Sequence, residues 1–105
     1  MSEEQAKFSI GQIVYHRIFR YRGVVLDVDP NYQNDDILYE LMAQSRPPKD
    51  KPWYHLLVDG ADYTTYVAEQ NLEKDNSNMP ITHPALNQFF GELKNGIYVL
   101  KKRMN

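Results

Sequence analysis

The chain has 105 residues, no cysteine and a formal net charge of −2 at pH 7, and 42% of its residues are hydrophobic. This length favours one domain with one modest core, and the lack of cysteine excludes disulfides and thiolate chemistry. The slight excess of acidic residues argues against tight nonspecific binding to nucleic acid, because such binding depends on basic residues that neutralise phosphates.

Two strands are expected near the N-terminus, after a polar segment at residues 1–7 that we expect to be frayed. Residues 12–17 form a short strand, and residues 21–29 form a clearer one because their hydrophobic residues alternate with a period of two. Pro30 ends this second strand, since proline lacks a backbone donor. This second strand is expected to carry Val24, Leu26 and Val28 on one face and Val25, Asp27 and Asp29 on the other.

A helix and then a hairpin are expected in the middle of the chain. The helix covers residues 34–44, with Asn34 as its N-cap. The hairpin pairs residues 53–59 with residues 63–68 around an Asp-Gly turn, which is a strong hairpin signal because glycine tolerates positive φ. The helix carries an apolar stripe formed by Ile37, Leu38, Leu41 and Met42.

The last third of the chain is expected to hold a second helix and an edge strand. Residues 73–78 read as a polar connection, and the Thr-His-Pro sequence at 82–84 resembles a helix start, where proline is tolerated. Asn-Gly at 95–96 is a turn signal, residues 97–100 form an edge strand, and residues 101–105 are expected to be frayed. The apolar stripe of this helix is Leu86, Phe89, Phe90 and Leu93.

These elements predict a mainly β protein with one or two short helices in a single domain over residues 1–105. Four or five short strands with a helical insertion favour a small, strongly bent sheet or a partly open barrel. The N-terminus lacks the basic start and apolar core of a signal peptide, and no apolar run approaches the roughly 20 residues that cross a bilayer. We therefore expect a soluble, cytoplasmic protein.

Catalytic patterns are absent from the sequence. His16, His55 and His83 lack the spacing of a metal site, no serine lies in a nucleophile elbow, and no glycine-rich phosphate loop is present. Asp27 and Asp29 share an expected strand face and can in principle bind a cation, but such pairs are more often the solvated face of a strand. We expect no enzyme, no metal and no cofactor.

The amino-acid sequences of several segments are distinctive, and so are their order and spacing along the chain. These segments are FSIGQ at residues 8–12, YRGVVLDVDP at 21–30, WYHLLVDG at 53–60 and YVAEQNL at 66–72, with a looser echo in ITHP at 81–84. Together they resemble the hemimethylated-DNA-binding (YccV-like) domain family. The resemblance implies an SH3-like β-barrel and binding to double-stranded, hemimethylated DNA. It also implies a link to the heat-shock response, help for the Lon protease with selected substrates, and a homotrimer.

The first hairpin is the candidate DNA-binding surface. His16, Arg17, Arg20 and Arg22 surround an expected turn, with aromatic residues between them. Arginine reaches phosphates or the guanine edge, and aromatic rings stack on exposed bases. The alternative is an ordinary solvated hairpin, in which the arginines pair with Asp27, Asp29 or Glu40.

A protein-interaction module is the second hypothesis, because an adaptor needs no catalytic residues. If Tyr54, Leu56 and Val58 face the core, Trp53 and His55 are available to a partner. In the alternative, both faces of this strand are buried. The helix over residues 34–44 offers Leu38 and Met42 as further partner-binding candidates. Pairing of the edge strand at residues 97–100 with a second copy would give a homo-oligomer.

Overall fold

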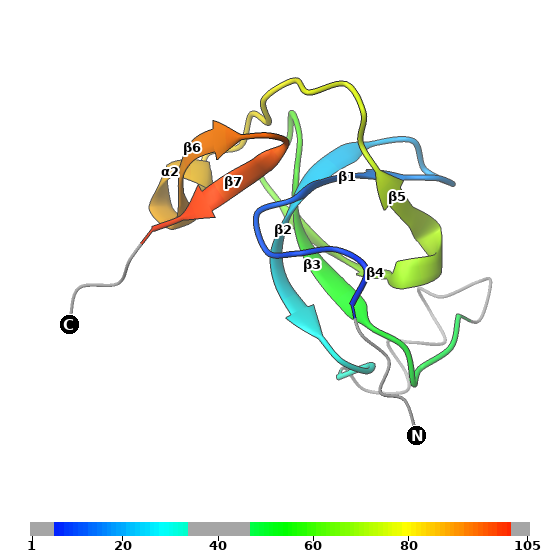
Figure 1. Ribbon diagram of the computed structural model, residues 1–105. Coiled ribbons are helices and arrows are strands. Elements are labelled where there is room, and N and C mark those ends of the chain that lie inside the picture. Colours follow the sequence, from blue (N-terminus) through cyan, green and yellow to red (C-terminus); the bar gives the residue numbers. More distant parts are fainter. Residues whose placement is uncertain (1–5, 34–46, 102–105) are drawn as a thin grey trace.

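The structure is a computed structural model that describes residues 6–33 and 47–101 (Figure 1). Within these residues the chain forms seven strands, one 3₁₀ turn (η1) and one short helix (α2). The strands are β1 (Ile13–His16), β2 (Arg22–Asp29), β3 (Trp53–Val58), β4 (Thr64–Ala68), β5 (Leu72–Lys74), β6 (Phe90–Lys94) and β7 (Ile97–Leu100), and the other two elements are η1 (Glu69–Asn71) and α2 (Leu86–Phe89).

Five strands form one antiparallel sheet in the order β4-β3-β2-β1-β5, and β6 pairs with β7 in a second sheet. Both predicted hairpins, β1–β2 and β3–β4, are present. After β4, the η1 turn carries the chain across to the other side, where β5 pairs with β1. The sheet thus curves towards closure without closing, as Figure 1 shows. The predicted mainly β fold, an SH3-like partly open barrel, is confirmed.

A β-bulge at Leu26 changes which residues of β2 share a face. Val25 pairs with Leu56 and Asp27 pairs with His55, so Leu26 has no partner across the ladder. The bulge inserts one residue and shifts the alternation. Val28 therefore packs beside Val25 in one cluster. The prediction that Val28 shares a face with Leu26 was wrong.

Both faces of the central strands are buried, so the two largest core clusters lie on opposite sides of the sheet, and Trp53 and Ala68 form a smaller third cluster. Neighbouring β2 residues Val24 and Val25 are both fully buried, although they point to opposite faces. One cluster fills the inside of the curved sheet and the other lies under the C-terminal segment. The first contains Phe8, Val14, Val25, Tyr54, Leu56, Val67 and Leu72, and the second contains Ile13, Val24, Leu57, Ile81, Phe90 and Tyr98.

The expected second helix is only one turn long. α2 ends at Phe89, and Phe90 has the extended conformation with φ −127° and ψ 148°. Residues 90–94 instead form β6, which gains a ladder of backbone hydrogen bonds with β7. Glycine at position 91 also disfavours a helix interior. The predicted turn at 95–96 and strand at 97–100 are confirmed.

Gly11 fastens the C-terminal hairpin to the sheet. Its N–H donates to the carbonyl of Val25 at 2.7 Å, and its own carbonyl accepts the N–H of Tyr98 at 2.7 Å. Its φ is +92°, and a Cβ at this position would overlap the carbonyl oxygen of Tyr98. Only glycine fits here, because both the conformation and the close approach exclude a side chain.

Some predicted features lie outside the described residues. The helix at residues 34–44, including Leu38 and Met42, is among them.

At the two ends of the described chain, the N–H of Lys7 donates to the Glu69 carboxylate at 2.9 Å, and the N–H of Lys101 donates to the Phe89 carbonyl at 2.9 Å. Among the helices in the described ranges, none is long and apolar enough to cross a membrane.

Candidate nucleic-acid interface

The connection between β1 and β2 is a tight turn over residues 17–20. The Arg20 N–H donates to the carbonyl of His16 at 2.9 Å, and Arg20 has a positive φ of 60°. The His16 N–H in turn donates to the Tyr21 carbonyl at 2.8 Å. In Figure 1 this turn projects from the end of the β1–β2 hairpin, away from β6 and β7.

His16 is the internal support of this turn. Its side chain is buried, with 3% exposure, and its Nδ1 accepts the N–H groups of Ile18 at 3.2 Å and Phe19 at 3.0 Å. The ring contacts those of Phe19 and Tyr21, with centroid separations of 4.8 and 5.1 Å. Burial lowers the pKa of His16, which favours the neutral ring. The buried ring and its Nδ1 atom thus support the turn from inside, and the DNA-contact proposal below does not use His16.

Arg17 and Arg20 lie on the outside of the same turn. Both are exposed, and neither guanidinium makes an ion pair or hydrogen bond within the part of the chain that the structure describes. Between them, Ile18 is 53% exposed and Phe19 is 73% exposed. The turn therefore presents two free cations and two apolar side chains in four consecutive residues.

Arg22 points away from this surface and joins three segments of the fold. Its guanidinium forms ion pairs with Asp59 at 3.0 Å and Asp75 at 3.2 Å, and also donates to the carbonyls of Met79 and Pro80. The alternative of an ion-paired arginine thus holds for Arg22, although its partners are not the acids that we considered. Arg22 is consequently unsuited to contact a phosphate.

The pKa of Asp75 reflects this network. Burial alone would raise the pKa of the carboxyl, but hydrogen bonds from Ser77 and the charge of Arg22 outweigh burial, and the pKa is lowered from its ordinary value. Asp75 is accordingly ionised at neutral pH. The Arg22 charge is compensated by two nearby carboxylates, and the exposed positive charge of the hairpin resides at Arg17 and Arg20.

Trp53 does not offer an exposed anchor. The ring is 5% exposed, its Nε1 donates to the Pro48 carbonyl at 3.1 Å, and it packs against Tyr32 and Tyr66. The alternative in which both faces of β3 are buried is the one that the structure shows. Because Trp53 is buried, it does not provide the accessible indole that the docking hypothesis required.

His55 is half-buried and takes part in a polar cluster beside these aromatic rings. Its Nε2 lies 3.0 Å from the Asp29 carboxylate, and the hydroxyl of Tyr66 donates to the same oxygen at 2.7 Å. Burial and this hydrogen bond both raise the pKa of Tyr66. The cluster joins β2, β3 and β4, so Asp29 does not belong to the solvated strand face that we considered for Asp27 and Asp29. The part of the chain that the structure describes holds no group of three or more potential metal ligands.

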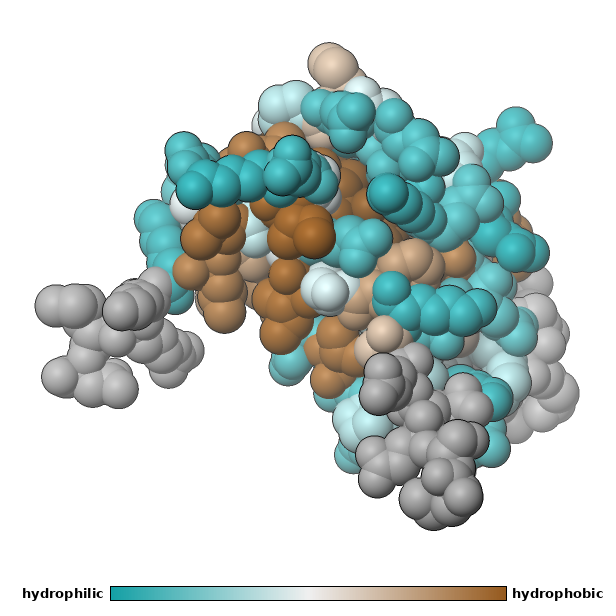
Figure 2. Space-filling model, in the orientation of Figure 1, coloured by the Kyte–Doolittle hydropathy of each residue, from teal (hydrophilic) through white to brown (hydrophobic). Residues whose placement is uncertain are grey.

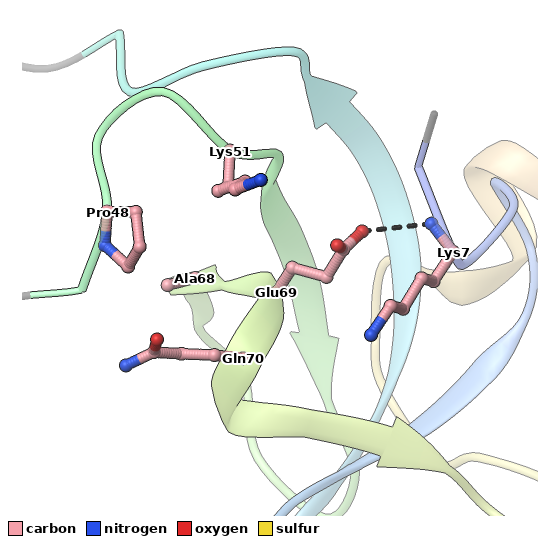
Figure 3. A pocket seen from close by; sticks show the side chains of 6 residues that line it. All are labelled: Lys7, Pro48, Lys51, Ala68, Glu69 and Gln70. Atoms are coloured by element: carbon pink, nitrogen blue, oxygen red, sulfur yellow. Dashed lines mark hydrogen bonds between the residues drawn. The ribbon is translucent and has the colours of Figure 1, made fainter. Parts of the chain in front are cut away.

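A pocket of about 220 Å³ opens beside Glu69 (Figure 3). The Glu69 carboxylate is nearly buried and accepts the Lys7 N–H at 2.9 Å and the hydroxyl of Tyr54 at 2.6 Å. Burial and the Glu69 hydrogen bond raise the pKa of Tyr54. Glu69 therefore ties the N-terminal segment to β3. The sequence analysis did not single out Glu69. The signal that could have found it is an acidic residue directly after the apolar pair Val67–Ala68.

The fold is thus a small, partly open antiparallel barrel whose β1–β2 turn exposes two arginines and a phenylalanine. The family described as hemimethylated DNA-binding protein YccV like matches residues 6–97. This match covers most of the 105 residues, and the chain belongs to that family, as its sequence predicted.

Proposed function

We propose that the protein is a non-enzymatic DNA-binding protein that contacts duplex DNA through the turn at residues 17–20. The observation that carries this proposal is that Arg17 and Arg20 are exposed, make no ion pair with the described residues and flank two exposed apolar side chains. Membership of the family described as hemimethylated DNA-binding supports the nature of the partner.

Charge sets the expected strength of this interaction. The net charge is −2, so the protein as a whole does not attract DNA, and two free arginines give few phosphate contacts. Affinity is then modest and its salt dependence shallow, because each neutralised phosphate contributes only about −0.9 to the slope of log affinity against log salt, and two contacts give a slope of about −2. A hemimethylated site differs from a fully methylated one by one uncharged methyl group. Ile18 and Phe19 supply the apolar contact that discrimination requires.

Fluorescence anisotropy with unmethylated, hemimethylated and fully methylated duplexes, each at low and moderate salt, tests this proposal. We expect salt-sensitive binding that is tightest for the hemimethylated duplex. Arg17→Glu and Arg20→Glu should each weaken binding at least 10-fold, since charge reversal replaces attraction by repulsion. Lys94→Glu is the control for the charge change, because Lys94 is an exposed residue of β6 whose ion pair with Glu92 is itself exposed and therefore weak. Equal effects of all three substitutions, or no binding by the unaltered protein, would refute the proposal.

A second candidate function is a protein-interaction adaptor, and a specific apolar surface favours it. Ile97, Val99 and Leu100 of β7 are 40%, 45% and 54% exposed, and Ile10 lies in the neighbouring segment, which meets β7 through the Gln12–Ile97 bridge. Figure 2 shows hydrophobic side chains gathered on this face beside β7, bordered by hydrophilic ones. Exposed apolar patches of this kind often mark interaction sites.

In this second candidate, the protein resembles the heat-shock protein HspQ and acts in the cytoplasm, where it helps the Lon protease degrade selected or denatured proteins. The β7 surface replaces Trp53 as the proposed docking site. Val99→Asp should then slow Lon-dependent degradation of a denatured model substrate, whereas Arg17→Glu should not. A reversed ranking of the two variants would contradict the adaptor proposal.

As an alternative use of the β7 surface, in place of partner docking, we propose that copies of the chain associate there, with a trimer as the expected state. Light scattering coupled to size-exclusion chromatography should give three times the mass of one chain. Val99→Asp should reduce this to the monomer mass. A monomer for the unaltered protein would refute the proposal.

A further inference from the structure

Phe19 is the most exposed of the large hydrophobic side chains that the structure describes, at 73%. The fold holds it in this position through specific contacts. The Phe19 N–H donates to His16 Nδ1, and one face of its ring lies 4.8 Å from the His16 ring. An exposed aromatic ring at the tip of a tight turn needs an explanation beyond hairpin formation, because any residue except proline can make the backbone hydrogen bond and the contact with His16 leaves most of Phe19 exposed.

The turn is organised before any partner arrives. His16 accepts two consecutive N–H groups from inside the turn, and its carbonyl accepts a third from Arg20. Its buried ring stacks on Tyr21, whose hydroxyl lies 2.8 Å from the Thr65 hydroxyl of β4. The position of Phe19 is thus fixed by the sheet itself. Such preorganisation reduces the entropy that is lost on binding.

The charges around Phe19 indicate the chemistry of the partner that it would contact. Arg17 and Arg20 flank it with two free cations, which suits a polyanion with an apolar interior that a side chain can enter. Duplex DNA has this construction, because phosphates line the outside and stacked bases fill the inside. Apolar side chains that enter a base step unstack it and kink the duplex, while nearby basic residues hold the backbone.

We propose that Phe19 is a wedge that enters a base step of the bound duplex, with Arg17 and Arg20 on the phosphates on either side. This inference rests on the DNA-binding function proposed above. The affinity for a site then depends on how easily its base step unstacks, so a flexible pyrimidine–purine step is preferred. A methyl group on one strand would be sensed through its effect on this local deformation as well as by contact.

The test uses the full chain and a hemimethylated duplex with 2-aminopurine at a central TA step, since this base brightens when it is unstacked. We expect a several-fold rise in fluorescence on binding. Phe19→Ala should abolish the rise and weaken binding about 10-fold, as expected for loss of one aromatic–base contact. Phe19→Leu, which keeps an apolar wedge, should retain most of the rise. Leu100→Ala is the control, because it truncates an exposed apolar residue of β7.

The possible results separate this inference from the function on which it rests. If the unaltered protein binds the duplex without a rise in fluorescence, or if Phe19→Ala retains the full rise, the wedge is refuted and DNA binding stands. If the unaltered protein binds no duplex, both proposals fail. If Phe19→Ala leaves DNA binding intact but impairs Lon-dependent degradation, Phe19 contacts protein and the wedge is refuted.

Discussion

Arg17 and Arg22 lie five residues apart and have opposite surroundings. Arg17 is exposed, and no ion pair joins it to any described residue. Arg22 is enclosed by two carboxylates and two carbonyls contributed by distant segments, including Asp59, 37 residues away in the chain. The same residue type is therefore available for a ligand in one position and committed to the fold in the other.

Replacement of Arg22 by alanine should lower the free energy of unfolding by about 1–3 kcal/mol, because a buried polar group that loses its partner retains its desolvation cost. Asp75, with a side chain only 9% exposed, would lose its cation. Arg17→Ala is the comparison, and it should change stability by no more than about 0.5 kcal/mol, as is usual for surface substitutions. Urea unfolding measures both. Equal effects would show that the Arg22 network does not stabilise the fold.

His16 makes the stability of the turn depend on pH. Its pKa in the folded protein is lowered below 6.5, whereas in the unfolded chain it is near 6.5. The unfolded chain therefore binds the proton more readily, and the free energy of unfolding decreases as the pH falls below 6.5. Protonation of Nδ1 would also remove the acceptor for the N–H groups of Ile18 and Phe19.

An NMR titration of the His16 ring should give a pKa below 6.5, with the amide signals of Ile18 and Phe19 moving in parallel. His16→Asn keeps a side-chain acceptor that does not titrate, so this variant should lose less stability than the unaltered protein between pH 7.5 and 5.5. A His16 pKa above 6.5 would contradict the proposed role of its neutral ring.

At the scale of elements, several backbone contacts join the C-terminal hairpin to the sheet, and the one at Gly11 is the closest of them. β7 meets the sheet where Gly11 receives the Tyr98 N–H, and Tyr98 also binds the Ile81 N–H through its hydroxyl at 2.8 Å. The second core cluster lies beneath this contact. Displacement of the hairpin would consequently expose one face of β2 and β3.

Gly11→Ala should destabilise the protein by more than about 2 kcal/mol, since it adds backbone strain at φ +92° and a steric overlap with Tyr98. Gly91→Ala in β6 is the matched control, because its nearest atom would lie at an ordinary 3.7 Å and its φ is not positive. That variant should stay within about 0.5 kcal/mol. Thermal unfolding measures both, and similar stability of the two variants would show that the Gly11 contact does not hold the hairpin.

The elements that local signals determine could be predicted from the sequence. Alternation located β2, and strand-like runs around Asp-Gly located β3 and β4; Asp-Gly and Asn-Gly also located two turns whose glycines have positive φ. The 86–93 stripe was misread because a helical turn followed by a strand gives the same apolar spacing. The pairing of β6 with β7 favours a helical turn followed by a strand over a continuous helix, and a hydrophobic pattern does not reveal that pairing.

At the scale of the whole molecule, the DNA-binding and adaptor proposals use different surfaces. The 17–20 turn lies at the end of the β1–β2 hairpin, and the apolar residues of β7 lie on the C-terminal side of the fold (Figure 1). The clustering of Arg17 and Arg20 could be predicted from the sequence, and the structure shows both exposed on one turn. The commitment of His16, Arg22 and Trp53 to the interior could not, because it depends on partners that the fold brings from elsewhere.

The central claim, that DNA binds at residues 17–20, is tested most directly by mapping amide chemical shifts of the ¹⁵N-labelled protein during titration with a hemimethylated duplex. The largest changes should fall on Arg17 to Arg20 and on Asn71, whose carbonyl accepts the Arg17 N–H at 2.8 Å. Residues 97–100 should remain unchanged. Changes centred on residues 97–100, or none at all, would contradict the account.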